Sequence, residues 1–246
     1  GQLQVGEPMN VVVPTGNFGN ILAGYYAKHM GLPIQTMVCA SNTNNVLTDF
    51  LKTGTYDRNR DFYATTSPSM DILISSNLER LLYHMSGESD AAVRGWMTQL
   101  AENGKYTVEP EVMAKIQNEF AAGYCDEVAV ADTIHKTYTD QNYLCDTHTA
   151  VAVKVYRDYV AQTGDDLPTV IDSTASPYKF SKSVLTAVLE GNTPQLDEFD
   201  MVEELHRVTG AAVPAPLAAL KDKAVRFTQV CDRENMSQMV FQLLNL

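Results

Sequence analysis

A glycine-bearing turn near the start of the chain is the segment most able to do chemistry. It has the sequence PTGNFGN at positions 14–20, directly after the apolar run Val11–Val13 and directly before an amphipathic stretch over 21–30. In a strand–turn–helix unit the backbone N–H groups of the turn converge, and the helix N-terminus adds partial positive charge. The turn could therefore hold a phosphate group, and a purely structural turn is the alternative.

The glycine pattern matches neither of two common phosphate-binding motifs. A Walker loop needs a Lys-Ser or Lys-Thr pair after its glycines, and none follows here. The spacing of the dinucleotide-binding fingerprint, G-x-G-x-x-G, is also absent. The pattern alone thus leaves the ligand, if any, open.

Two further polar clusters could contact a ligand. Residues 172–177 follow a predicted strand, and ligands of open α/β sheets bind at the carboxyl ends of strands. The same residues could instead cap the next helix. Ser75, Asn77 and Arg80 could together bind an anionic substrate, or they could form a solvated helix face.

Histidines and cysteines give no metal or catalytic pattern. Four of the five histidines stand alone in predicted helices, and His148 lies beside Asp146 at a predicted helix start, where we assign it no catalytic role. The four cysteines are widely separated, with no CxxC pair, and we expect reduced, mostly buried thiols. We predict no metal site and no catalytic residue in this chain.

Composition restricts the class of protein. At 246 residues and 45% hydrophobic content, the chain can bury one sizeable core or two modest ones. A net charge of −12 argues against a nucleic-acid partner. No apolar run approaches the roughly 18–20 residues that span a bilayer, so we expect a cytoplasmic protein without a membrane partner.

Strand-like and helix-like segments alternate, which predicts an α/β fold with an open, mostly parallel sheet flanked by helices. We predict strands at 10–13, 34–40, 169–172 and 226–231, with weaker candidates at 62–65 and 121–125. Predicted helices cover 18–30, 45–53, 70–85, 90–103, 110–120, 127–138, 147–162, 181–191, 196–206 and 236–246. Residues 86–143 look like a helical insertion or accessory region between 1–85 and 144–246.

Several stretches, in the same order along the chain, resemble threonine synthases of bacteria and fungi. Residues 12–28 resemble the family's phosphate-cradling segment, and residues 51–56 its F-K-T-G-x-Y stretch. Residues 67–80 are similar to S-P-A-M-D-I-x-x-S-S-N-x-E-R. Residues 146–151 resemble D-P-H-T-A-V with Thr147 for the proline, and residues 173–180 resemble S-T-A-H-P-A-K-F with Ser176 for the histidine.

The resemblance implies a type II fold for enzymes that use pyridoxal 5'-phosphate (PLP). It implies that the cofactor phosphate lies on the backbone N–H groups of Gly16, Asn17, Phe18, Gly19 and Asn20. It also implies that the Thr174 hydroxyl faces the pyridine nitrogen. A hydroxyl there can donate to an unprotonated nitrogen, which suits elimination over transamination.

The family's reaction is the conversion of O-phospho-L-homoserine and water into L-threonine and phosphate, a PLP-dependent carbon–oxygen lyase activity. For the substrate phosphate the candidates are Ser75, Asn77 and Arg80. The family's Schiff-base lysine lies in an N-terminal portion upstream of the phosphate loop, and no lysine here has its context. The resemblance therefore implies a C-terminal portion that needs that N-terminal portion as partner, is inactive alone, and binds PLP weakly or not at all.

Three alternatives stay open. The first is another type II PLP enzyme, such as a β-replacing synthase or a dehydratase. The second is a non-catalytic phosphate-binding module, and the third is a structural remnant without a ligand.

Overall fold

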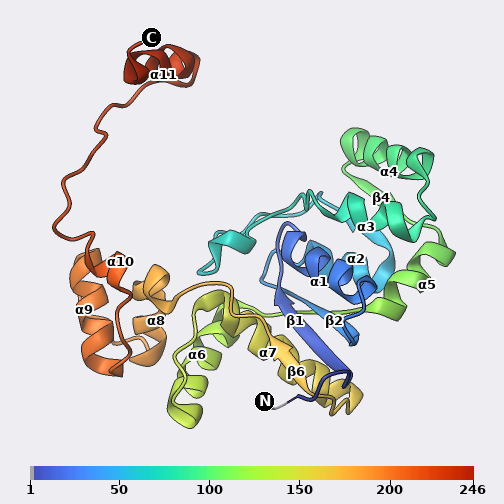
Figure 1. Cartoon of the computed structure of the whole chain (residues 1–246), viewed down its shortest axis with the longest axis horizontal. Coiled ribbons are helices and arrows are strands. Elements are labelled where there is room, and N and C mark those ends of the chain that lie inside the picture. The colour runs from blue at the N-terminus through green and yellow to red at the C-terminus, as the bar shows by residue number, and fades with distance from the viewer. Residues whose placement is uncertain (1–2) are drawn as a thin grey trace. The chain divides into compact units, whose positions relative to one another are not determined.

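The computed structural model describes residues 3–246, and the chain divides into two compact units at Ala211–Ala212. All strands lie in the first unit, where a four-stranded sheet has the order β5-β2-β1-β6 (Figure 1). These strands are β1 (Met9–Pro14), β2 (Ile34–Ser41), β5 (Phe120–Tyr124) and β6 (Thr169–Ile171). Each neighbouring pair is parallel, which confirms the predicted parallel α/β fold.

Helices cover both faces of this sheet, which explains why its central strands are continuous apolar runs. One face carries Val13, Cys39 and Phe120, in a core with residues of α1 (Gly19–His29), α2 (Val46–Thr53) and α5 (Pro110–Glu119). Since side chains alternate along a strand, the intervening residues face the other side. There α7 (Thr147–Thr163) contacts every strand of the sheet.

A small antiparallel sheet extends the hydrophobic core that the main sheet forms with α1, α2 and α5. It pairs β3 (Thr55–Asp57) with β4 (Lys105–Thr107), and it is flanked by α3 (Leu78–Met85) and α4 (Asp90–Asn103). The rings of Tyr56 and Tyr106 stack with centroids 5.4 Å apart. Residues 86–143 contain helices and also β5 of the main sheet. The division of the chain into regions 1–85, 86–143 and 144–246 stays a prediction.

The remaining helices of the first unit are α6 (Glu127–Gln141), α8 (Ser181–Val188) and α9 (Glu198–Thr209). Side chains cap α6 and α9, where Asp126 and Asp197 accept from the backbone N–H three residues on. The second unit holds α10 (Ala215–Ala218) and α11 (Met236–Leu244), with mostly exposed side chains. Within residues 3–246, no helix combines the length and hydropathy needed to cross a bilayer.

Three predicted elements are wrong. Residues 70–85 do not form one helix: a short 3₁₀ turn, η1 (Pro68–Met70), is followed by irregular chain as far as α3. Polar contacts hold that irregular stretch, because Asp71 accepts from Asn42, Asn44 and Thr65, while Ser75 donates to the Gly16 carbonyl.

The predicted strand at 62–65 is absent for a related reason. The Asn44 side chain binds both the N–H and the carbonyl of Tyr63, and Asp71 accepts the N–H of Thr65. Side chains therefore satisfy backbone groups that a neighbouring strand would otherwise bind. The predicted strand at 226–231 lies in the second unit, whose residues 212–246 contain no strand for it to pair with.

Candidate phosphate-binding site

The predicted phosphate loop, residues 14–20, lies at the carboxyl edge of the main sheet, where ligands of open α/β sheets bind. It follows β1, and residues 172–177 follow the neighbouring strand β6 at the same edge. Asn20 Nδ2 donates to Asp172 Oδ2 at 2.6 Å. The structure thus brings the loop beside the segment that carries Thr174, whose side chain is exposed.

Phe18 anchors the loop in an unusual backbone conformation. Its φ of 66° is left-handed, which is uncommon for a residue other than glycine. Its side chain is fully buried, and its ring centroid lies 5.7 Å from that of Phe120. Burial of the ring offsets the backbone cost and fixes where the turn points.

Most N–H groups of the loop are left for a ligand. The Gly19 N–H donates to Asn17 Oδ1 at 3.0 Å. Within the described residues, the N–H groups of Gly16, Asn17, Phe18 and Asn20 form no hydrogen bond with a protein acceptor. These groups surround the N-terminus of α1, where the helix dipole favours an anion.

The carbonyl oxygens of Gly16 and Asn17, by contrast, accept hydrogen bonds. Ser75 Oγ donates to the Gly16 oxygen at 2.9 Å. The N–H and the Nδ2 of Asn77 both donate to the Asn17 oxygen, at 3.1 and 3.0 Å. Because each carbonyl shares a peptide plane with the next N–H, these bonds orient the N–H groups of Asn17 and Phe18.

Ser75 and Asn77 therefore hold the loop, whatever they do for a substrate. The buried Ser75 hydroxyl is 2.9 Å from Gly16, and Asn77 Oδ1 accepts from Arg80 Nη1 at 2.5 Å. The Arg80 side chain is exposed and keeps further donors. The assignment of these three residues to a substrate phosphate stays a prediction.

Gly16 is needed because the chain passes very close to it. A Cβ there would lie 2.9 Å from Met70 Cα and 3.1 Å from the Ser69 oxygen. The segment that touches it, residues 65–72, is held in turn by the Asp71 network. Sequence reasoning missed that network, although the polar run of Ser41, Asn42 and Asn44 directly after a buried strand was a usable signal.

Asp146 and His148, at the start of α7, form a buried pair behind the same segment. His148 Nδ1 lies 3.2 Å from Asp146 Oδ1, and its Nε2 lies 3.2 Å from the Ser69 nitrogen. Burial alone would raise the pKa of the Asp146 carboxyl, but hydrogen bonds from His148 and Thr149 outweigh it and hold that pKa below its usual value. Sequence reasoning placed His148 at the helix start without a role.

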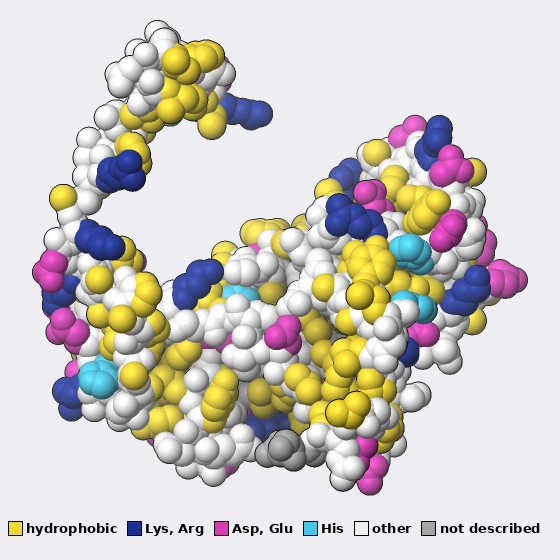
Figure 2. Space-filling model, viewed as in Figure 1, with side chains coloured by type: hydrophobic (Ala, Val, Ile, Leu, Met, Phe, Trp, Pro, Cys, Tyr) yellow, Lys and Arg dark blue, Asp and Glu magenta, His cyan; other side chains and the backbone are white. Residues whose placement is uncertain are grey.

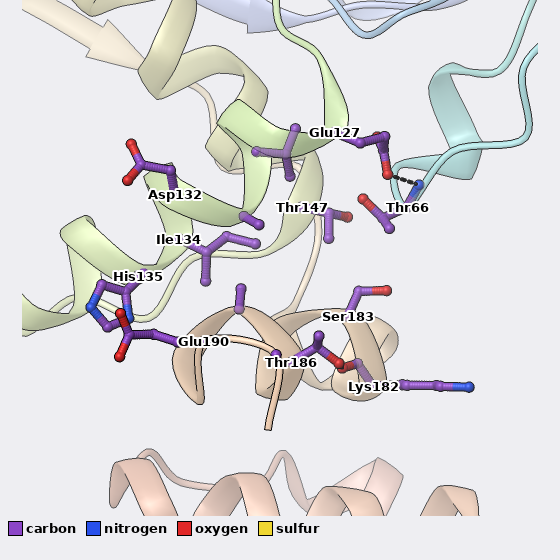
Figure 3. Close-up of a pocket in the computed structure, with 14 residues that line it drawn as sticks. Thr66, Glu127, Asp132, Ile134, His135, Thr147, Lys182, Ser183, Thr186 and Glu190 are labelled. Carbon is purple, nitrogen blue, oxygen red and sulfur yellow. Dashed lines mark hydrogen bonds between the residues drawn. The ribbon is translucent and has the colours of Figure 1, made fainter. Parts of the chain in front are cut away.

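A separate cavity of about 430 Å³ lies between α6 and α8 (Figure 3). Apolar side chains such as Val130 and Ile134 line it, and Glu127 Oε2 accepts the Thr66 N–H at 2.9 Å at its edge. None of the predicted site residues lines this cavity. It borders residues 65–72 on the side of α6 and is distinct from the phosphate loop.

Several lysine side chains make structural contacts within the fold. Lys28 Nζ lies 2.6 Å from Glu119 Oε2, and Lys179 Nζ lies 5.4 Å from the centroid of the Phe180 ring. In the described part of the chain, no three His, Cys, Asp or Glu side chains gather as metal ligands. On the face drawn in Figure 2, Lys and Arg are interspersed with Asp and Glu. Anion binding at the loop would accordingly depend on backbone N–H groups.

Comparisons with known proteins give consistent matches. The family model described as "Threonine synthase, C-terminal" matches residues 149–240. Threonine synthase-like 1 of Homo sapiens is 44% identical over 189 residues, which cover 76% of this chain and 25% of that protein. Threonine synthase of Saccharomyces cerevisiae is 37% identical, over 82% of this chain and 42% of its own.

Solved structures show the same relation. The structure of threonine synthase from yeast superposes with a TM-score of 0.80 at 33% identity, covering 97% of this chain and 48% of that chain. PLP-bound threonine synthase from Brucella melitensis gives a TM-score of 0.70 at 40% identity, covering 82% and 45%. This chain spans between a quarter and a half of the length of these relatives.

Proposed function

This chain is a threonine synthase-related protein that covers a C-terminal-type portion of threonine synthase chains, and on that premise we propose that its loop at 16–20 binds the phosphate of PLP. The observation that supports the proposal is the set of unpartnered N–H groups of Gly16, Asn17, Phe18 and Asn20. They lie at the positive end of α1, at the carboxyl edge of the sheet.

The residues present suit this cofactor. Gly16 lets the loop approach residues 69–70 closely, and Ser75 and Asn77 orient the peptide planes from behind. When bound, PLP supplies an electron-withdrawing ring that stabilises negative charge on the carbons of an amino-acid substrate. Thr174, on the segment that Asn20 ties to the loop through Asp172, would offer its hydroxyl to the ring nitrogen.

The substrate in this proposal is O-phospho-L-homoserine, which needs a second anion site. Arg80 is the residue we assign to its phosphate, because its guanidinium is exposed and keeps donors that Asn77 does not use. Ser75 and Asn77 would contribute through the loop and through the position of Arg80. The reaction is the release of phosphate and the addition of water that yield L-threonine.

A complete enzyme also needs the Schiff-base lysine, which the N-terminal portion of the relatives would supply as partner. We therefore expect this chain alone to be inactive and to bind PLP weakly or not at all. In the full protein encoded by the source gene, product analysis with O-phospho-L-homoserine and with L-serine tests the reaction. L-Threonine and phosphate from the first substrate are expected, and turnover of L-serine alone would point to a dehydratase or a β-replacing enzyme.

The cofactor site has its own test in the substitution Asn20→Asp. The new carboxylate would lose the hydrogen bond to Asp172 and place two like charges in close contact at the edge of the loop, so we expect PLP affinity of the full protein to fall by at least about tenfold. Asn192→Asp is a matched control, because Asn192 is exposed and lies beyond α8, away from the loop. Equal PLP affinity in the two variants would contradict the site.

A further inference from the structure

His148 lies too deep to meet a substrate directly, and yet both of its ring nitrogens have hydrogen-bond partners. It is 3% exposed, Asp146 is fully buried, and the imidazole packs against the Phe180 ring with centroids 4.8 Å apart. A buried imidazole with both nitrogens engaged has a defined orientation.

The partners determine which ring nitrogen carries the hydrogen. The Ser69 N–H can only donate, so Nε2, 3.2 Å away, must accept and carry no hydrogen. The hydrogen is then on Nδ1, which faces Asp146 Oδ1 at 3.2 Å and Thr147 Oγ1 at 3.3 Å. The ring is therefore neutral, with its hydrogen on Nδ1.

Asp146 is in turn fixed as an acceptor. Its Oδ1 accepts from the His148 N–H at 2.8 Å and from the Thr149 N–H at 3.3 Å, and the Thr149 hydroxyl donates to Oδ2. These bonds cap α7, a 17-residue helix that contacts all strands of the main sheet. His148 thus connects a rigid element of the fold to Ser69.

Ser69 is one of the residues that lie against the phosphate loop. Its carbonyl oxygen and the next Cα, of Met70, are the backbone atoms that a Cβ on Gly16 would strike. The loop thus rests on residues 69–70, and residues 69–70 are held from behind by the imidazole. A displacement of Ser69 would displace Gly16 and its N–H.

We propose that His148, as the Nδ1–H tautomer, is a positioning residue that holds Ser69 and Met70 against Gly16 and thereby sets the geometry of the phosphate loop. This inference rests on the proposed function only for the identity of the anion. The contact between His148, Ser69 and Gly16 can be tested without any cofactor. His148 itself touches neither the anion nor a reacting atom.

The first test is NMR of the imidazole nitrogens in the wild-type chain. We expect two-bond ¹H–¹⁵N correlations that show a protonated Nδ1 and an unprotonated Nε2 on His148. A protonated Nε2 would overturn the proposal, because the Ser69 N–H would then have no acceptor. This measurement needs no variant, so it decides the matter even if substitutions at His148 prevent folding.

The second test compares His148→Leu with His148→Gln, using inorganic phosphate as the probe. Leucine removes the acceptor, so we expect shifted amide resonances of Ser69 and Gly16 and phosphate binding weakened by about three- to tenfold, as for the loss of one hydrogen bond. Glutamine can place its Oε1 where Nε2 lies, so it should restore both readouts. His135→Gln on α6 is the matched control and should change neither.

Unchanged Gly16 resonances in His148→Leu would overturn the proposal. Equal losses of phosphate affinity in the leucine and glutamine variants would also overturn it. The loss would then come from removal of the imidazole packing and not from removal of the hydrogen-bond acceptor. If the wild-type chain binds no phosphate, which the proposed function allows for the chain alone, the Ser69 and Gly16 resonances still decide the role of His148, and PLP binding by the full protein decides the proposed function.

Discussion

Gly16→Ala is the substitution that most sharply tests how the loop is built. Neither Gly16 nor Gly24 has a positive φ, so alanine suits the backbone at both positions. At Gly16, however, the new Cβ would lie 2.9 Å from Met70 Cα, closer than such contacts normally come. At Gly24, inside α1, the nearest atom to a new Cβ is Met37 Sδ at 3.8 Å, an ordinary contact.

The expected magnitudes follow from these contacts. Overpacking against backbone atoms costs about 1–3 kcal/mol, so Gly16→Ala should lower the free energy of unfolding by that amount. For a unit of this size it should lower the melting temperature by about 2–12 °C. Gly24→Ala should instead raise the unfolding free energy by about 0.5–1 kcal/mol, since alanine is the better helix residue. Both changes restrict the unfolded chain equally.

Urea unfolding followed by circular dichroism gives both free energies, and a phosphate titration gives the effect on the site. We expect phosphate affinity to fall by about tenfold in Gly16→Ala, because the loop must move away from residues 69–70, and to stay unchanged in Gly24→Ala. If Gly16→Ala matches wild type in both stability and phosphate affinity, Gly16 does not approach Ser69 and Met70 closely in solution.

The remaining predictions concern the anchor, the buried pair and the thiols. Phe18→Ala should cost about 3–5 kcal/mol of unfolding free energy, whereas Phe62→Ala, at a side chain 58% exposed, should change it by less than about 0.5 kcal/mol; similar values for the two would refute the anchor. Asp146→Ala should cost about 2–5 kcal/mol at pH 7 through the lost cap and unpaired donors. Because the pKa of Asp146 is lowered in the fold, this stability difference should hold above pH 3.8, the ordinary pKa, and shrink as pH falls further through the lowered value. Urea unfolding at several pH values measures the difference. A difference that grows on acidification would contradict the lowered pKa of Asp146. Burial raises the pKa of Cys39, Cys125 and Cys145 to about 12, so only the partly exposed Cys231 should react quickly with a disulfide reagent at pH 8. More than one fast-reacting thiol in the native protein would show that at least one of these three thiols is accessible in solution.

Local signals in the sequence were sufficient for the segment from β1 to α1. An apolar strand, two glycines and an amphipathic stretch are adjacent in the chain, and they form a strand, a turn and a helix. The edge strand β5 was also predictable from its own residues. Each of these elements is favoured by residues that are neighbours in sequence, so no knowledge of tertiary contacts was needed.

The supporting half of the site was not predictable in this way. The apolar spacing over 70–85 favoured one helix, yet contacts of Asp71 with Asn42 and of Ser75 with Gly16 stabilise irregular chain instead. These partners are 29 and 59 residues apart in sequence, and His148 and Ser69 are 79 apart. Periodicity carries no information on such pairs, so the residues that hold the loop could be found only in the fold.

The central claim is that the N–H groups of the loop bind a phosphate carried by an aromatic aldehyde. The most direct measurement is a pair of ¹H–¹⁵N NMR titrations of the full protein encoded by the source gene, ¹⁵N-labelled, one with pyridoxal 5'-phosphate and one with pyridoxal. We predict that the amide resonances of Gly16, Asn17, Phe18 and Asn20 shift with the phosphorylated compound at millimolar concentration and stay in place with pyridoxal. Resonances that respond equally to both compounds, or to neither, would contradict the claim.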